Sequence, residues 1–334
     1  MPYLLNYWPT PLERVAIVRG QAGAKLRVGE RFRLMSWNIQ FGASRRYHFF
    51  YDGGPDVHAE WEVVQRTLDA QREMIFRAAP DILLLQEVDR DSARTSRIDQ
   101  LPRLIDGLSF ASWASTPYHR SRFVPVPLGR AIGRVDMHLA TASRYEMTWA
   151  RRRALPLLAE PLWRRAFNLK RAVLETAIQV EGLAQPLLVL NTHLSAFSRG
   201  DGTMARQVAA IMERLAFLDA RGIPWVLAGD LNLLPPGDSP ARLGAEAGYY
   251  ADRENPILPL YSRYQSGVPA EEEARSPARF YTYLPFGAKV PDRRLDYVFV
   301  SDRLDLHGLR VMRDSSPSSD HLPLLLVASI KAAP

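Results

Sequence analysis

The chain has 334 residues, of which 47% are hydrophobic and 24% charged, enough for one large domain or two ordinary ones with a sizeable core. Its formal net charge of +7 favours an anionic partner, such as a phosphate ester, a nucleic acid or an anionic membrane. The sequence contains no cysteine, which excludes a disulfide framework, a thiolate metal site and a cysteine nucleophile.

No apolar run approaches the roughly 20 residues that a membrane span needs. The N-terminus lacks the basic start and apolar centre of a secretory signal, so we expect a cytoplasmic protein. We also expect a monomer, with residues 1–30 as an N-terminal arm and residues 31–332 as a single domain.

The first part of the chain predicts a strand, a long loop, a helix and a second strand. Residues 32–39 form the first core strand, which ends at Asn38, and a loop follows over 40–57. Apolar residues at helical spacing predict an amphipathic helix over 58–79, which Pro80 ends. Residues 81–85 form the next buried strand, and it brings Gln86 and Glu87 to its end.

The later elements repeat this pattern. A short helix is predicted over 99–108, and strands over 110–116, 134–141, 172–180 and 187–190. A helix begins near Asp201 and closes at Gly222, and the apolar run after it ends in Gly229 and Asp230. Residues 235–280 predict loops with short helices, and strands over 295–300 and 322–330 complete the chain.

Two segments between these elements have more than one interpretation. The aromatic residues of the loop 40–57, among them His48 and Tyr51, could bind substrate or cover the edge of the core. The segment 144–171 is the most basic part of the chain and has aromatic residues between its arginines. Its part 149–165 could contact a membrane surface or a nucleic acid, or it could be a solvated, partly packed connection.

Polar side chains recur where the apolar runs end. They are Asn38, Glu87, His193, Asp230, Asn232, Asp296, Asp320 and His321. Each has an ordinary interpretation by itself, as a turn former or a surface side chain. Their recurrence at the same place is informative, because strand ends on one side of a sheet converge to form a cleft.

These residue types suit phosphoester chemistry with a hard metal ion. Mg²⁺ prefers oxygen ligands, often one or two carboxylates with water and substrate phosphate, and we expect Mn²⁺ to substitute for it. Zinc would favour more imidazole than two histidines supply. Carboxylates and imidazoles can also activate a water molecule and stabilise charge in the transition state.

The chain resembles the endonuclease/exonuclease/phosphatase superfamily, which includes DNase I-like nucleases, sphingomyelinases and inositol-phosphate phosphatases. The motifs that carry the resemblance follow the family's order from residue 36 to 323. They are Ser36-Trp37-Asn38-Ile39, Leu85-Gln86-Glu87-Val88, Ser143-Arg144-Tyr145, Asn191-Thr192-His193-Leu194, Gly229-Asp230-Leu231-Asn232, Leu295-Asp296-Tyr297 and Ser319-Asp320-His321-Leu322-Pro323. The resemblance implies an α/β fold, a four-layer α/β/β/α sandwich with two mixed sheets packed face to face.

The resemblance also implies a role for each strand-end residue. Glu87 would hold the metal ion, with Asn38 beside it and Asp320 completing the site. The remaining roles are catalytic. Asp296 would orient His321, that pair or Asp230 would deprotonate the attacking water, and His193 and Asn232 would bind phosphate oxygens. Arg171 is a further candidate for phosphate binding, and the general base stays open between the pair and Asp230.

We therefore expect a Mg²⁺-dependent phosphodiesterase or phosphatase. A nuclease, a sphingomyelinase-like phospholipid hydrolase and a non-catalytic phosphate-binding module are the alternatives. One departure from the family pattern bears on the choice. Apurinic-site endonucleases of the family commonly carry an Asp two residues after the first-strand Asn, whereas this chain has Gln40, which disfavours a dedicated DNA-repair enzyme.

Overall fold

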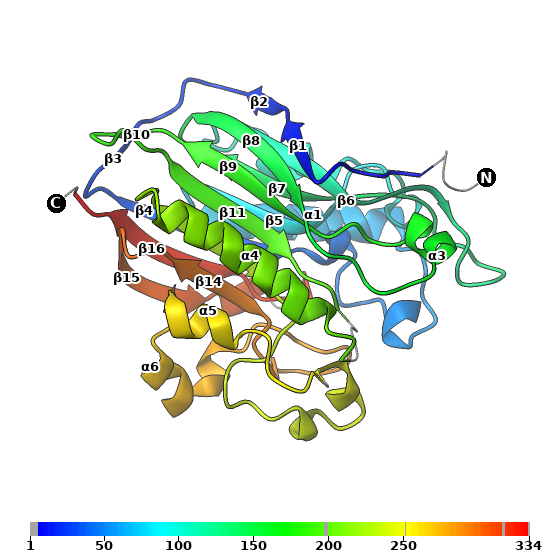
Figure 1. Cartoon of the computed structure of the whole chain (residues 1–334). Helices are drawn as coiled ribbons and strands as arrows, with labels where there is room; N and C mark the ends of the chain where they lie inside the picture. Colours follow the sequence, from blue (N-terminus) through cyan, green and yellow to red (C-terminus); the bar gives the residue numbers. More distant parts are fainter. Residues whose placement is uncertain (1–5, 197–199, 251, 316–317, 333–334) are drawn as a thin grey trace.

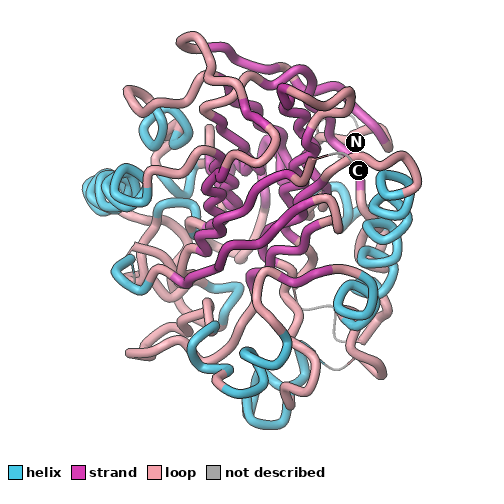
Figure 2. Tube along the Cα trace, turned by 90° about the vertical axis from the view of Figure 1, so that its left-hand side faces the viewer, coloured by secondary structure: helices cyan, strands magenta, loops and turns pink. Residues whose placement is uncertain are grey.

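The computed structural model of the chain describes residues 6–196, 200–250, 252–315 and 318–332. Two seven-stranded sheets pack face to face within this part, and helices lie on the outside of both (Figures 1 and 2). Both sheets contain parallel and antiparallel pairs. The predicted four-layer α/β/β/α sandwich is thereby confirmed.

The two sheets interleave strands from the whole length of the chain. The first sheet has the order β1 (Leu12–Val15), β8 (Met147–Ala154), β9 (Ala172–Ile178), β11 (Leu187–His193), β12 (Trp225–Asp230), β14 (Asp296–Val300) and β13 (Gln265–Ser266). The second has the order β15 (Leu304–Val311), β16 (Leu324–Ile330), β4 (Arg31–Asn38), β5 (Ile82–Asp89), β7 (Gly133–Ser143), β6 (Ser112–Val124) and β2 (Ile17–Arg19). A small separate pair joins β3 (Leu26–Arg27) to β10 (Val180–Glu181).

Helices cover the outer face of each sheet. The α-helices are α1 (Trp61–Ala78), α2 (Gln100–Ile105), α3 (Leu162–Phe167), α4 (Thr203–Asp219), α5 (Leu258–Arg263) and α6 (Ala270–Arg275). Helices α1 and α2 pack on the second sheet, and α4 and α5 pack on the first. None of the helices in the described part of the chain is long and apolar enough to cross a membrane.

The space between the sheets is filled by every second residue of the strands. Leu34 of β4, Val189 of β11, Val226 of β12 and Val298 of β14 all belong to this central apolar cluster. Their neighbours in sequence point outward, as Trp37 does toward α1. Each central strand is therefore buried on both faces, which explains why it reads as an uninterrupted apolar run.

The N-terminal residues contribute to both sheets. Strand β1 pairs with β8 in the first sheet, and β2 pairs with β6 in the second. Part of the segment expected as an arm thus forms one edge strand of each sheet. The boundary that we place at residue 30 stays a prediction.

The basic segment contains a strand that the sequence analysis does not predict. Strand β8 runs through Arg151, Arg152 and Arg153, which look too highly charged for a sheet. Their charges have buried partners: Arg153 binds the carboxylate of Glu175 on β9 at 2.8 Å, and Arg152 donates to backbone carbonyls. Strand β15, also missing from the prediction, lies at the other sheet's edge and is partly exposed, so its apolar residues alternate with polar ones.

A layer of amides joins the two sheets beneath the ends of the central strands. The Gln86 side chain on β5 donates through Nε2 to Oδ1 of Asn191 on β11 at 2.8 Å. Asn191 Nδ2 in turn donates to the backbone carbonyls of Leu85 at 3.1 Å and Ala140 at 2.8 Å. Asn191 and Gln86 are completely buried, so these bonds have no water to replace them.

We predict that Asn191→Leu lowers the free energy of unfolding by about 3 kcal/mol, because it removes three buried hydrogen bonds, one from the Gln86 amide and two to the Leu85 and Ala140 carbonyls. The matched control is Thr192→Val, which removes one hydrogen bond within a single sheet, to the Ala172 carbonyl, and should cost about 1 kcal/mol. Urea denaturation followed by tryptophan fluorescence measures both. Equal losses for the two variants would contradict a special role for the amide layer.

Candidate active site

The predicted site residues come together because several strands end at one edge of the sandwich. Asn38 ends β4, His193 ends β11 and Asp230 ends β12, and each continues the series of side chains that points between the sheets. Asp296 begins β14, which runs antiparallel to β12 and pairs residue 296 with residue 230. The apolar series between the sheets thus ends in polar side chains on four strands.

Glu87 reaches the same space through an irregularity of β5. The pairing of β5 with β7 shifts between Leu85 and Val88, and Glu87 has a positive φ of 58°. A left-handed backbone is unfavourable for a residue with a Cβ, and such strain is concentrated at functional sites. The bulge brings the Glu87 carboxylate within 3.1 Å of Asn38 Nδ2.

Gly229 has a structural reason to precede Asp230. Its φ is +149°, and a Cβ there would lie 1.9 Å from the carbonyl oxygen of Thr192 on the neighbouring strand. Only glycine allows β12 to approach β11 this closely. The pairing that results sets Asp230 opposite His193.

Asp230 is the centre of the polar network. Its Oδ2 accepts from Asn38 Nδ2 at 3.0 Å and lies 3.4 Å from His193 Nε2 and 3.6 Å from His321 Nε2. Its Oδ1 accepts from the backbone N–H of Asn232 at 3.0 Å. Four separate parts of the sequence therefore meet at one carboxylate.

His321 forms a buried pair with Asp296. Its Nδ1 lies 2.8 Å from Asp296 Oδ2, which fixes the ring with Nε2 toward Asp230. Burial lowers the pKa of His321, but the nearby carboxylates of Asp296 and Asp230 outweigh it and hold that pKa well above its ordinary value. His321 is thus an imidazolium at neutral pH.

His193 has the opposite protonation. Burial, together with the positive charges of Arg171 and His321, lowers the pKa of His193 well below its ordinary value. Burial also raises the pKa of Tyr118 well above its ordinary value, so its hydroxyl keeps its proton. That hydroxyl lies 3.2 Å from His193 Nδ1, and its donation leaves the Nε2 proton directed toward Asp230.

Two acids of the site hold a proton unusually tightly. Burial raises the pKa of Asp230 to about 7, although the positive charge of His321 acts against this. Burial likewise raises the pKa of Asp320 to about 7, against the effect of His321 and with repulsion from Glu87 added. Both groups therefore change charge near neutral pH, where a change of charge is most useful to an enzyme.

Two sets of residues could hold a cation. Asp230, Asp296 and His321 offer ligand atoms that all lie within 4.8 Å of one another, and Asp296 Oδ1 has no hydrogen-bond partner within the described residues. However, a protonated His321 already supplies a positive charge between these two carboxylates. The other set is Asn38, Glu87 and Asp320. Its two carboxylates are oxygen donors of the kind that a hard cation prefers, whereas Asn38 Oδ1 accepts from the backbone N–H of Gln40 at 3.0 Å.

Hydrogen-bond contacts link the members of this second set. The Ser319 hydroxyl links its members, because it donates to the Asn38 carbonyl at 2.8 Å and lies 3.4 Å from Asp320 Oδ1. Glu87 in turn contacts the Asn38 amide. These donors fit Mg²⁺, which binds to few carboxylates and keeps several of its water molecules.

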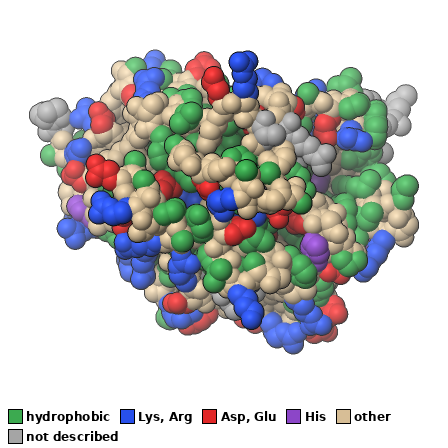
Figure 3. Space-filling model, turned by 90° about the horizontal axis from the view of Figure 1, so that it is seen from below, with side chains coloured by type: hydrophobic (Ala, Val, Ile, Leu, Met, Phe, Trp, Pro, Cys, Tyr) green, Lys and Arg blue, Asp and Glu red, His purple; other side chains and the backbone are tan. Residues whose placement is uncertain are grey.

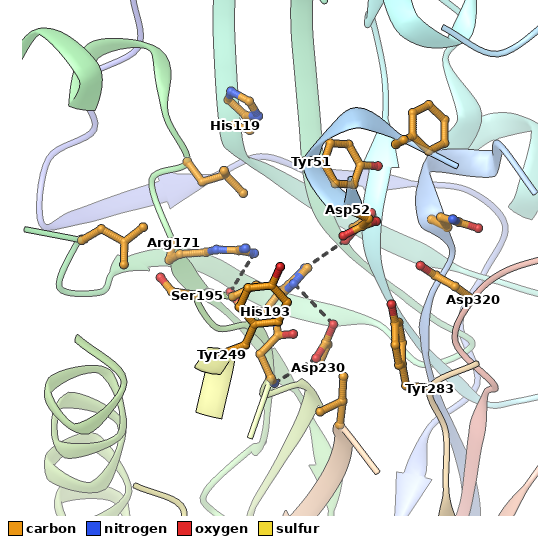
Figure 4. Close-up of a pocket in the computed structure, with 18 of the residues that line it drawn as sticks. Tyr51, Asp52, His119, Arg171, His193, Ser195, Asp230, Tyr249, Tyr283 and Asp320 are labelled. Atoms are coloured by element: carbon orange, nitrogen blue, oxygen red, sulfur yellow. Dashed lines mark hydrogen bonds and ion pairs between the residues drawn. The ribbon is translucent and has the colours of Figure 1, made fainter. Parts of the chain in front are cut away.

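A cavity of about 1350 Å³ opens above these residues. Glu87, Arg171, His193, Asp230, Asn232, Asp320 and His321 line it, while Asn38 and Asp296 lie beneath them. In Figure 4, Asp320 and Tyr283 lie across the cavity from Arg171 and His193. Figure 3 shows acidic side chains near the middle of one face, with hydrophobic side chains around them.

The predicted substrate-binding residues also border this cavity. His48 and Tyr51 are in its wall, and the His48 ring stacks on Phe286 with the ring centroids 4.3 Å apart. Arg171 Nη1 donates to the His193 carbonyl at 3.3 Å, and its guanidinium packs against the Tyr118 ring. All the residues proposed from the sequence thus lie within this cavity or directly beneath it.

Some residues of the site are not predicted from the sequence. Tyr118 orients His193 from the middle of β6, where no strand end or motif marks it. Tyr283 lies in a loop of ordinary composition and packs edge-on against the His321 ring, with the ring centroids 5.2 Å apart. The Thr282 hydroxyl accepts hydrogen bonds from the backbone N–H groups of Leu295 and Asp296. The alternation of side chains along β6 predicts that Tyr118 is buried, but it does not predict that His193 is its partner.

Solved structures share this fold at low sequence identity. An endonuclease/exonuclease/phosphatase protein from Beutenbergia cavernae matches 90% of the chain and 72% of its own, with a TM-score of 0.62 and 22% identity. The catalytic domain of human Nocturnin, solved with bound sulfate, matches 95% of the chain and 97% of its own, with a TM-score of 0.57 and 19% identity. Truncated Caenorhabditis elegans TDP2 matches 91% and 98%, with a TM-score of 0.52 and 15% identity.

The sequence itself matches one family model over most of its length. No curated protein matches the chain significantly. The model of the Endonuclease/Exonuclease/phosphatase family covers residues 35–321, which span all the strand-end residues that meet in the cavity. The chain therefore belongs to the Endonuclease/Exonuclease/phosphatase family, as its motifs predict.

Proposed function

We propose that the protein is a phosphoesterase that hydrolyses a phosphate ester with the help of Mg²⁺, for which Mn²⁺ can substitute. One observation carries the proposal: a buried carboxylate, Asp230, lies within 3.6 Å of an amide and two imidazoles, one protonated and one neutral, at the floor of an open cavity. A non-catalytic phosphate-binding module would have no need of a proton acceptor tuned to neutral pH.

The metal ion would be held by Glu87 and Asp320 with Asn38 beside them. When bound, it supplies charge stabilisation at the phosphoryl oxygens and lowers the pKa of water. The cavity keeps this position accessible to a substrate, since Glu87 and Asp320 both border it.

Asp230 is the residue best placed to accept the proton of the attacking water. Its pKa of about 7 lets it be ionised at neutral pH and still accept a proton in the transition state. His321 carries its own proton and is held by Asp296, so its role in this arrangement is to stabilise negative charge. The sequence leaves the general base open, and this division of charge favours Asp230.

The remaining polar groups would bind and orient the phosphate. His193 presents its Nε2 proton beside Asp230, and Arg171 lies behind it with a fixed positive charge. Two hydrogen bonds hold Asn232 in place. Its backbone N–H donates to Asp230, and its Nδ2 donates to the Leu194 carbonyl. Donors fixed before the substrate binds need no reorganisation during the reaction, which is the main source of electrostatic catalysis.

We predict that Asp230→Asn lowers kcat toward bis(p-nitrophenyl) phosphate at least about 100-fold in Mg²⁺, the usual scale for loss of a positioned base. The substitution keeps the shape of the side chain and one accepting oxygen, but the amide cannot take up the proton. Asp305→Asn, on the exposed edge strand β15, is the matched control and should keep the wild-type rate. Wild-type turnover by Asp230→Asn would remove Asp230 from the mechanism.

We predict that the affinity for Mg²⁺ rises with pH. Asp320 must lose a proton before it binds the ion, and its pKa of about 7 means that it is mostly protonated below neutrality. Its ionised fraction rises about tenfold from about pH 6 to about pH 8, and the apparent affinity should rise in proportion. Isothermal titration calorimetry at both pH values measures this, and Asp320→Asn should abolish this part of the pH dependence. An affinity that falls as the pH rises would contradict the assignment.

A further inference from the structure

Three separate segments place large apolar side chains at the mouth of the cavity. Val126 lies in the connection between β6 and β7, Trp163 in α3, and Phe286 in the loop before β14. They expose 45%, 57% and 51% of their surface, and each also lines the cavity. Exposure of this kind has an energetic cost, so apolar residues gathered around one opening indicate an interaction surface.

The same segments carry further exposed apolar residues beyond the cavity itself. Leu128, at the tip of the β6–β7 connection, exposes 94% of its surface, and Phe123 at its base exposes 56%. Leu162 beside Trp163, and Val290 after Phe286, are also exposed. We call these three segments, residues 122–130, 161–165 and 286–290, the apolar rim.

The charge of the apolar rim has a single sign. Residues 121–135, 161–171 and 281–291 contain arginines and lysines but no aspartate or glutamate. Arg122, Arg130, Arg164 and Lys289 are exposed among the apolar side chains. Apolar tips flanked by basic side chains are the composition by which proteins bind to the surface of an anionic bilayer.

We propose that the apolar rim docks on an anionic phospholipid bilayer, which brings a lipid phosphoester to the mouth of the cavity. The apolar side chains enter the interface between headgroups and acyl chains, and the arginines and lysine contact lipid phosphates. Docking in this way needs no membrane-spanning segment.

The side chains of the rim suit a bilayer better than a nucleic acid. Nucleic-acid surfaces bind phosphates through basic groups and stack bases on aromatic rings. Leu128, Val290 and Leu162 are aliphatic and cannot stack, yet they are the most exposed apolar side chains of the rim. Such side chains gain free energy when they leave water for an apolar medium, which a bilayer provides and a phosphate backbone does not.

The substrate class follows from docking together with the proposed function, on which it rests. Leu157, Leu158 and Phe167 extend the apolar wall inward from the rim, so a lipid can enter with part of its apolar portion still covered. In the reaction, water oxygen bonds to phosphorus and the bond between phosphorus and the leaving oxygen breaks. The water gives one proton to Asp230 and the leaving oxygen takes one proton from solvent. Asp230 then returns its proton to solvent, so that atoms and charge balance.

Vesicle co-sedimentation of the full chain tests the docking. We expect wild-type protein to bind phosphatidylcholine vesicles that contain about 30% phosphatidylglycerol and to remain free with phosphatidylcholine alone. The triple variant Phe123→Ser, Leu128→Ser and Leu162→Ser should bind at least about tenfold more weakly, since three apolar contacts are lost. Arg130→Gln should weaken binding about fivefold.

Phe76→Ser is the matched control, because Phe76 is exposed on α1 and does not line the cavity. It should bind vesicles as the wild type does. No binding of the wild type to anionic vesicles, or equal binding by the triple variant, overturns the proposal. The proposal is also overturned if the rim variants lose affinity for a DNA or RNA oligonucleotide while their binding to vesicles is unchanged.

Hydrolysis measured in parallel separates this proposal from the proposed function. Wild-type protein assayed with Mg²⁺ on bis(p-nitrophenyl) phosphate reports the phosphoesterase site alone. Vesicle binding without any hydrolysis would contradict the proposed function and leave the docking surface standing. Hydrolysis of the soluble ester without vesicle binding would contradict the docking surface and leave the proposed function standing.

Discussion

The hydrogen bond between the side chains of Gln86 and Asn191 sets the geometry on which the site depends. It crosses from one sheet to the other one residue pair below the catalytic layer, and so fixes how β5 and β11 align. Strand side chains alternate with a period of two, and a slip of one residue would turn every polar group of the site outward. The amide layer makes such a slip costly, because Asn191 also binds carbonyls of both β5 and β7.

Above this layer the site is organised by charge. Burying a single charged acid or imidazole is unfavourable. When they are buried together, their pKa values shift so that one histidine is protonated, one is neutral and the acids titrate near neutral pH. Two further hydrogen bonds hold the Asp296–His321 pair in place. The Thr282 hydroxyl accepts from the backbone N–H of Asp296, and the Ser319 hydroxyl accepts from the backbone N–H of His321. The groups that face the cavity are consequently the ones left free to bind a substrate.

The sequence predicts most of the site because the central strands are buried on both faces. An uninterrupted apolar run that stops at Asn38, His193 or Asp230 marks the strand end and the polar residue together. The prediction stops where side chains act through tertiary contacts. Tyr118 lies within a strand, and β8 carries three arginines, of which Arg153 binds Glu175 on β9. The bulge at Glu87 likewise depends on β7 and leaves no trace in local composition.

The two short strands at the start of the chain have a consequence for how the protein stays dispersed. In the described part of the chain, β1 and β2 are the strands that pair with the outer edges of β8 and β6, and each is shorter than the strand that it covers. An uncovered edge offers a row of free backbone groups to any other chain. While the N-terminal strands are unpaired, the molecule presents both edges to its neighbours, so self-association competes with the pairing of β1 and β2.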